Sequence, residues 1–333
     1  MIAKQFNLKK FLTNYALYII MIIMIIVIAV ISPKFLSFRV LRDIFMQSST
    51  RILVALGCMF IIVCGSADLS GGRVVGLAAV FAGSFAQQAT YYNKFWPGIG
   101  ELPIIVPIFS GIAIGALFGM ISGFTVSKLR VPAFLATLGT QMIAYGVNCL
   151  YFNKAPNNSQ PLGGYTEGFS KLGTGSLFGI PYLIIISLGV AVIIWIFQTK
   201  TCLGKQIFAV GGNPDAAKVS GINVFKTLMV TFTVAGALYG LAGCLEAART
   251  GSATSSYGLG YELDAIASCI VGGCSAGGGV GRVPGVILGV LIFNIINYGL
   301  TFIGLSSYWQ FAVKGLIIIV AVALDVRKYS DKN

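Results

Sequence analysis

Ionisable side chains occur within or beside the apolar runs of this sequence, where an isolated charge is costly. A charged group at membrane depth is stable only when it is paired or hydrated, so such residues commonly mark the path of a solute or ion. On this ground we take five residues as candidates for a translocation pathway: Asp68, Arg73, Glu262, Asp264 and Lys314.

A structural role is the alternative for each of these charges, either in an ion pair or at the membrane interface. Glu246 and Arg249 belong to the same set of charges, and the structural role is the one we expect for Arg249 and for Glu262. Both roles stay open for Asp68, Arg73 and Lys314.

Uncharged polar side chains in the same apolar belts could bind the hydroxyl groups of a sugar, and aromatic rings could stack on its faces. An ordinary belt of aromatic residues at the membrane interface explains the rings somewhat better. The polar candidates are Asn148, Asn294 and Asn297, with Gln310 in addition, and the rings are Tyr145, Tyr298, Tyr308 and Trp309.

Hydrolytic or redox chemistry is not expected on this chain. It has no histidine, which removes the commonest general base and metal ligand. Its seven cysteines lie mostly in apolar segments, are odd in number and form no C-x-x-C, so we interpret them as apolar filling. We predict no catalytic residue, no metal site and no enzyme activity.

The composition indicates the elements that must position these residues. Of 333 residues, 56% are hydrophobic and only 10% are charged, whereas soluble domains carry about a quarter of charged residues. A membrane-spanning helix needs about 20 apolar residues. We therefore predict an all-α polytopic membrane protein, a single transmembrane domain over 1–333, with about ten membrane-spanning segments. They are 15–31, 48–66, 71–90, 104–127, 133–152, 181–198, 226–247, 262–276, 283–300 and 308–325.

The basic residues indicate the orientation of these segments. The net charge of +13 comes from residues that flank apolar spans and do not cluster with aromatic residues, so nucleic-acid binding is not expected. More of them lie in the loops that become cytoplasmic when both termini are cytoplasmic. The first external loop, with Lys34, Arg39 and Arg42, is an exception, which an amphipathic segment on the membrane surface would accommodate. Arg51 is also assigned to the external side.

Glycines recur at helical spacing in the fourth segment. Gly111, Gly115, Gly119 and Gly123 share one helix face, and such a face lets a neighbouring helix approach closely. We predict tight packing inside one bundle, with a dimer seam as the alternative.

A second glycine-rich stretch, 272–282, lacks the Gly-Lys-Ser/Thr of a phosphate-binding loop and predicts a break between two helices. The pattern Gly-Arg-Val-x-Gly occurs both at 72–76 and at 281–285, which suggests two related broken-helix elements, although chance remains a rival explanation.

Two long polar loops stand out, an external one at 153–180 and a cytoplasmic one at 199–225. The second contains the complete pattern of a short helix: a capping Asn213, Pro214 at the first helical position, Asp215 and Lys218 complementing the dipole, and Gly221 closing it. A short rigid helix outside the membrane is suited to insert into a partner. We favour this coupling role over an inert loop for Asn213, Pro214, Asp215, Ala216, Ala217, Lys218 and Gly221.

The sequence resembles the permease subunits of bacterial ATP-binding-cassette (ABC) sugar importers of the ribose/galactose class. The resemblance covers nearly the whole chain. Its longest stretches are DLSGGRVVGLAAV (68–80), GKQIFAVGGNPDAAKVSGINV (204–224) and YWQFAVKGLIIIVAVALD (308–325), with QSSTRILVALG (47–57), PAFLATLGT (132–140), LEAARTGSAT (245–254), YELDAIASCIVGG (261–273) and INYGLTFIG (296–304) between them.

The resemblance implies a homodimer in the bacterial inner membrane, a cytoplasmic ATPase with two nucleotide-binding domains, and an exported sugar-binding protein. It implies that the loop at Asn213–Gly221 contacts the ATPase, that ATP and Mg belong to that partner, and that this chain carries no cofactor. The expected solute is galactose or a methyl galactoside. Ribose, another pentose or a nucleoside is the alternative, and an ion-coupled secondary carrier is the alternative from another class.

One stretch departs from the family pattern. At 275–285 the family usually has small or hydroxyl residues, whereas this chain has Arg282 and Pro284. We therefore transfer no gate residue through this stretch, and no sugar-contacting residue from the family.

Overall fold

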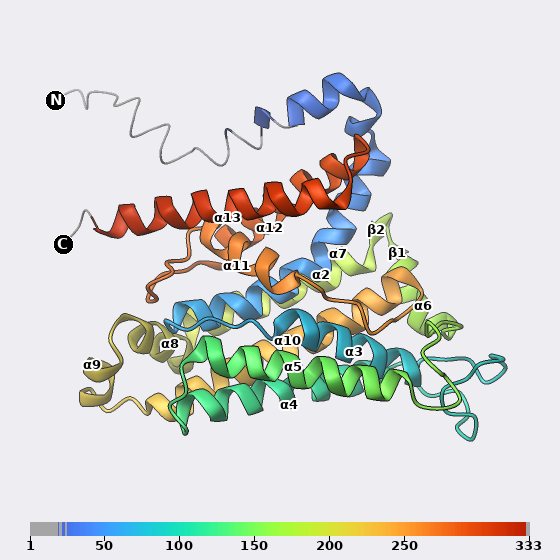
Figure 1. Cartoon of the computed structure of the whole chain (residues 1–333), viewed down its shortest axis with the longest axis horizontal. Coiled ribbons are helices and arrows are strands. Elements are labelled where there is room, and N and C mark those ends of the chain that lie inside the picture. Colours follow the sequence, from blue (N-terminus) through green and yellow to red (C-terminus); the bar gives the residue numbers. More distant parts are fainter. Residues whose placement is uncertain (1–18, 20–21, 24, 331–333) are drawn as a thin grey trace.

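The computed structural model describes residues 19, 22–23 and 25–330 (Figure 1). The first predicted span, 15–31, lies partly outside the described residues, and its residues 25–31 are helical. The elements that follow are η1 (Pro33–Leu36), α2 (Phe38–Val63), α3 (Gly71–Phe85), α4 (Ile105–Ser127), α5 (Ala133–Phe152), α6 (Glu167–Thr174), β1 (Ser176–Leu177), β2 (Ile180–Pro181), α7 (Tyr182–Lys200), α8 (Cys202–Gly212), α9 (Pro214–Val219), α10 (Val224–Thr250), α11 (Tyr261–Val271), α12 (Val283–Phe302) and α13 (Ser307–Ser330).

Among the described residues, six helices are long and apolar enough to cross a membrane, and α3 is a shorter apolar helix. The six are α2, α4, α5, α7, α10 and α12. The only named strands in this part of the chain, β1 and β2, form one short antiparallel pair. The predicted helical, polytopic membrane architecture is therefore confirmed.

The two long polar loops lie at opposite ends of the helical bundle (Figure 1). Helices α8 and α9 form one end, whereas α6 and the β1–β2 hairpin lie at the other. At that second end, bridges join Gln87 to Tyr165 and Leu162 to Ala253, so the loops after α3, α5 and α10 are held together. The loop at 153–180 is thus a folded cap and not a simple connection.

Helices α4 and α10 cross at their glycines. A Cβ atom on Gly115 would strike the carbonyl oxygen of Gly236, and one on Gly119 would strike that of Phe232. Gly111 lies in the same way against Gly240 and Cys244. Because backbones can meet this closely only without side chains, the glycine face predicted on α4 is used for packing inside this chain.

Helix α2 begins earlier than predicted, at Phe38 instead of residue 48, and Ser37 accepts a hydrogen bond from the Val40 amide. Its 26 residues span about 39 Å, longer than the roughly 30 Å of a bilayer core. Arg51, counted among the external basic residues, lies within α2, as it did within the predicted span. The charged residues Arg39, Arg42 and Asp43 interrupt the apolar pattern ahead of residue 48 and hid the earlier start of the helix.

Helices α3 and α11 are too short to cross a bilayer alone. Their 15 and 11 residues span about 22 and 16 Å. The predicted segments 71–90 and 262–276 were thus too long at their C-terminal ends. The two helices begin beside each other, since a Cβ atom on Gly72 would strike Glu262 and Gly258. The predicted helix break at 272–282 is confirmed, because this stretch is non-helical between α11 and α12.

Candidate translocation site

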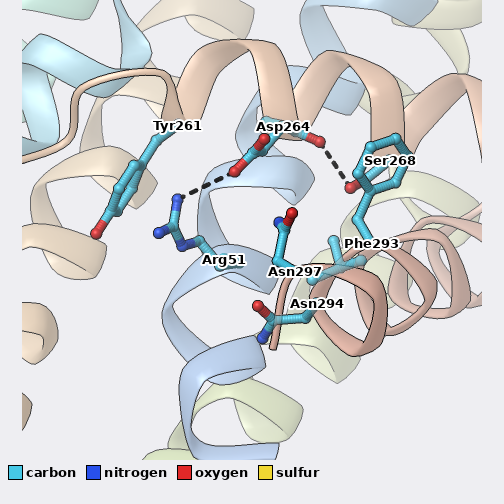
Figure 2. Close-up of a pocket in the computed structure, with 9 residues that line it drawn as sticks. Arg51, Tyr261, Asp264, Ser268, Phe293, Asn294 and Asn297 are labelled. Carbon is cyan, nitrogen blue, oxygen red and sulfur yellow. Dashed lines mark hydrogen bonds and ion pairs between the residues drawn. The ribbon is translucent and has the colours of Figure 1, made fainter. Parts of the chain in front are cut away.

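A narrow polar pocket lies between α2, α11 and α12 (Figure 2). Its volume is about 10 Å³, enough for roughly one water molecule. The polar side chains that line it are Arg51, Tyr261, Asp264, Ser268, Asn294 and Asn297. A hexose, with its many heavy atoms, does not fit this volume.

Asp264 is the centre of the charges at this pocket. Lys314 from α13 donates to Asp264 Oδ2 at 3.1 Å, and Arg51 Nη1 from α2 lies 3.6 Å from the same oxygen. The side chains of Asp264, Lys314 and Arg51 are 15%, 21% and 27% exposed, so solvent screens their charges only in part. Asp264 lies in the first turn of α11, where the helix dipole favours a negative charge.

The charges continue from this pocket toward α10. The Arg51 guanidinium lies over the Tyr261 ring, 3.1 Å from its centroid, and the Tyr261 hydroxyl donates to Glu246 Oε1 at 2.9 Å. Glu246 also accepts from Thr50 at 2.8 Å and from Arg249 at 2.8 Å. One connected network therefore joins α2, α10, α11 and α13.

The two asparagines of the pocket differ in their partners. Asn294 donates to Ser48 Oγ at 2.7 Å and to the Ile44 carbonyl at 3.3 Å, which fixes α12 against α2. Asn297 Oδ1 is buried and has no hydrogen-bond partner among the described residues. Figure 2 shows the Asn297 amide directed toward the space between Arg51 and Asp264. An unpaired buried acceptor is costly, so this oxygen is available to a polar solute or water.

The remaining pathway candidates lie around the start of α3. Asp68 is buried and accepts from the Ser70 amide at 2.8 Å and from its hydroxyl at 2.6 Å. Arg73 lies over the Tyr145 ring at 4.2 Å, and Asn148 donates to the Ser255 carbonyl at 3.4 Å. The predicted site residues thus form two groups. Asp264, Asn294, Asn297 and Lys314 are in the first, and Asp68, Arg73, Asn148 and Glu262 are in the second.

Of the two residues expected to have a structural role, the structure shows an ion pair among the described residues only for Arg249. Arg249 makes an ion pair with Glu246 at 2.8 Å. Glu262 is buried but makes no ion pair within the described part of the chain, and its Oε2 atom has no hydrogen-bond partner there. The glycine at position 72 lets this carboxylate reach the start of α3.

Helix α9 has the termini that the sequence predicted. Asn213 Oδ1 accepts from the Ala216 amide at 2.9 Å, Pro214 begins the helix, and Gly221 has a φ of +82°. Ala217 is only 4% exposed, so it packs α9 onto its own chain and cannot reach a partner from this position. Val219, in contrast, is 90% exposed on the same helix.

Several residues of these sites were not selected from the sequence. Arg51 was assigned to the external side, Tyr261 was not considered, and Glu246 was noted only as a charge. A charge within a long apolar run was the available signal for Arg51. No signal in the sequence indicated the exposure of Val219, because valine occurs in most of the helices, where it is commonly buried.

The described residues contain no group of three or more His, Cys, Asp or Glu that could hold a metal ion. All seven cysteines are free, and five of them are buried. The polar groups described above can bind and position a solute by hydrogen bonds.

Long apolar helices and two half-length helices that begin side by side are the architecture of a polytopic membrane protein. Comparison with known proteins agrees. The profile of the family described as "Branched-chain amino acid transport system / permease component" matches residues 40–322, and the chain belongs to this family.

Three relatives are similar over most of their length. The chain is 44% identical to the galactose/methyl galactoside import permease protein of Haemophilus influenzae, over 99% of this chain and 98% of the relative. It is 45% identical to the protein of the same name from Escherichia coli K12, over 98% and 99%. The ribose import permease protein of that strain is 37% identical, over 90% and 89%. No solved structure matches the chain.

Proposed function

We propose that this chain is the transmembrane permease subunit of an ATP-binding-cassette importer that carries galactose or a methyl galactoside across the bacterial inner membrane. The observation that carries this proposal is the 44–45% identity to import permeases of that name over nearly the full length of both chains. The ribose permease is less similar and covers less of the chain, so ribose is the second candidate.

Ten crossings with both termini cytoplasmic form part of the proposal, within one transmembrane domain over residues 1–333. The ten are the helix before η1 followed by α2, α3, α4, α5, α7, α10, α11, α12 and α13. The position of α13 supports this orientation, because it ends at the same end of the bundle as α9 (Figure 1). The half-length helices α3 and α11 would each complete a crossing together with the irregular segment beside it.

Helix α9 would contact a separate cytoplasmic ATPase with two nucleotide-binding domains, which would hold ATP and Mg. Its exposed Asn213, Pro214, Asp215, Ala216 and Lys218 are available for this contact, together with Val219. An isolated exposed valine on a six-residue helix is best explained by burial in a partner. The folded cap around α6, at the other end of the bundle, would receive an exported sugar-binding protein.

The solute would pass the polar pocket in a homodimer by alternating access, without any covalent step on this chain. ATP binding to the partner would displace α9 and open the pocket. Asp264, Asn294, Asn297 and Lys314 would then offer hydrogen bonds to sugar hydroxyls, with Asp68, Arg73, Asn148 and Glu262 further along the path. Arg51 and Tyr261 join the first group because they line the same cavity.

Reconstitution tests the function directly. The chain is incorporated into liposomes with the ATPase and binding protein encoded beside it, and uptake is measured for galactose, methyl galactoside, ribose, a nucleoside and leucine. We expect ATP-dependent uptake of galactose or methyl galactoside. Preferential uptake of ribose or a nucleoside would change the substrate, and leucine uptake would favour the amino-acid description of the family. Uptake by this chain alone, driven by an ion gradient, would contradict the ATP-driven class.

A further inference from the structure

The end of α8 touches the loop between α11 and α12 through backbone atoms. The Gly279 amide donates to the Val63 carbonyl at the end of α2, at 2.9 Å. A Cβ atom on Gly211 would strike that same carbonyl and would lie 2.9 Å from the Gly279 nitrogen. A Cβ atom on Gly278 would lie 2.5 Å from the Gly211 carbonyl oxygen. We refer to Gly211, Gly278, Gly279 and Val63 as the glycine junction.

On one side, the glycine junction is continuous with α9. Gly211 is followed by Gly212 and then by Asn213, which ends α8 and caps α9 at the same time. Helix α9 is held to its own chain by the buried Ala217, whose carbonyl accepts from the Ile222 amide at 3.0 Å. Because the two helices share Asn213, a displacement of α9 is passed directly to the end of α8.

On the other side, the glycine junction is continuous with the polar pocket. Helices α11 and α12 are in backbone contact, because a Cβ atom on Gly272 would strike the Gly285 carbonyl and one on Gly289 would strike that of Ser268. Their connecting loop is closed by the Ser275 amide, which donates to the Val280 carbonyl at 3.0 Å. This α11–α12 hairpin carries Asp264, Ser268, Asn294 and Asn297, so it moves the pocket residues as a unit.

We propose that the glycine junction transmits displacement of α9 to the α11–α12 hairpin and thereby opens the polar pocket. The contacts are between backbones, which leave no side chain whose rotation could absorb the movement. The proposal rests on the proposed function, since an ATPase must move α9. It assigns to Gly211, Gly278 and Gly279 the role of positioning residues, which do not touch the solute.

Gly211→Ala tests the junction, and Gly212→Ala is the matched control. The two glycines are adjacent in α8, but an added Cβ meets the backbone of α2 at position 211 and nothing within 4 Å at position 212. In the reconstituted importer we expect Gly211→Ala to lower ATP-dependent uptake by about tenfold, within the range of residues that couple two sites. ATPase binding and ATP hydrolysis should continue, and Gly212→Ala should stay within about twofold of the parent.

A second readout follows the pocket itself. Ala265 is buried and lines the pocket, so Ala265→Cys reports its opening by reaction with a thiol reagent, in a chain that also carries Cys202→Ser and Cys149→Ser. ATP should accelerate this labelling in the parent and in Gly212→Ala, but not in Gly211→Ala. An unchanged acceleration in Gly211→Ala, or equal loss in both variants, would overturn the proposal. A parent without any ATP response would instead count against the proposed function.

A cross-link addresses the case in which Gly211→Ala does not fold. A Cβ atom on Gly279 would lie 3.2 Å from Gly212 Cα, so a short reducible bis-methanethiosulfonate reagent can join the two thiols in the variant Gly212→Cys with Gly279→Cys. If the two segments move together, this cross-link should leave ATP-dependent uptake intact. Loss of uptake on cross-linking that is restored by reduction would show that the segments must slide past each other, and would overturn the proposal.

Discussion

Lys314 and Asp264 meet across two helices at 3.1 Å, and the carboxylate of Asp264 also lies within 4 Å of Arg51. One negative charge therefore neutralises two cations from α2 and α13. The arrangement is unequal, because either cation can be lost while the carboxylate keeps an ion pair, whereas loss of the carboxylate leaves both cations without an ion pair among the described residues. This inequality makes the first prediction.

Asp264→Asn should be more damaging than Lys314→Met. The first leaves two half-buried cations facing each other, and we expect a loss of about 1–3 kcal/mol in the free energy of unfolding, together with loss of uptake. The second leaves Arg51 on Asp264 and should cost less. Thermal unfolding of the detergent-solubilised variants measures the difference. Equal unfolding temperatures for the two variants would contradict the bridging role of Asp264.

Tyr261 should tolerate loss of its hydroxyl better than loss of its ring. Tyr261→Phe removes one hydrogen bond to the Glu246 carboxylate, worth about 1.5–3 kcal/mol, while Glu246 keeps Thr50 and Arg249. Tyr261→Ala also removes the surface on which Arg51 lies. We expect partial uptake with Tyr261→Phe and little with Tyr261→Ala, both measured at matched amounts of protein in the membrane. A severe defect in both would show that the hydroxyl itself contacts the solute.

Gly115→Ala should destabilise the bundle at the crossing of α4 and α10. The added methyl meets backbone atoms of Gly236 and Gly240, which cannot rotate away, so we expect about 2 kcal/mol. Gly189→Ala in α7 is the control, because nothing lies within 4 Å of its added Cβ atom. The thermal midpoint should fall in the first variant and stay level or rise in the second. A neutral Gly115→Ala would place the crossing farther apart than it is here.

Asn213→Ala should weaken uptake by destabilising helix α9. Loss of the cap costs about 1 kcal/mol, and α9 is only six residues long, so its helical population should fall roughly fivefold. Asn223→Ala is the control, because Asn223 caps α10 by accepting from the Lys226 amide at 2.9 Å, and α10 is held by a long buried face. ATP-dependent uptake should be lower in the first variant than in the second, while Asn213→Ser should restore it. Equal uptake by all three variants would contradict the coupling role of α9.

The sequence predicted those features that depend on local patterns. The cap of α9 could be read from Asn213, Pro214 and Gly221, since each has a defined position in a short helix. The glycine face of α4 could be read from its spacing, although its partner on α10 could not. The helix break at 272–282 was visible because glycines interrupt an otherwise apolar run.

The features that were missed depend on contacts between distant segments. Arg51 and Asp264 are more than two hundred positions apart, so their pairing has no trace in a local pattern. The shortness of α3 and α11 was hidden because uncharged, mostly small residues, 86–90 (AQQAT) and 272–276 (GGCSA), follow both helix ends. Ala217 and Val219 have similar chemical character, and only the packing of α9 decides that one is buried and the other exposed.

The volume of the polar pocket also bears on the energetics of the cell. A space for roughly one water molecule cannot admit an ion together with its hydration shell, and the Arg51 guanidinium lines that space. If the pocket lies on the proposed path of the solute, its size blocks hydrated sodium and potassium there while no solute is being delivered. The permease then does not dissipate the ion gradients on which other transporters depend.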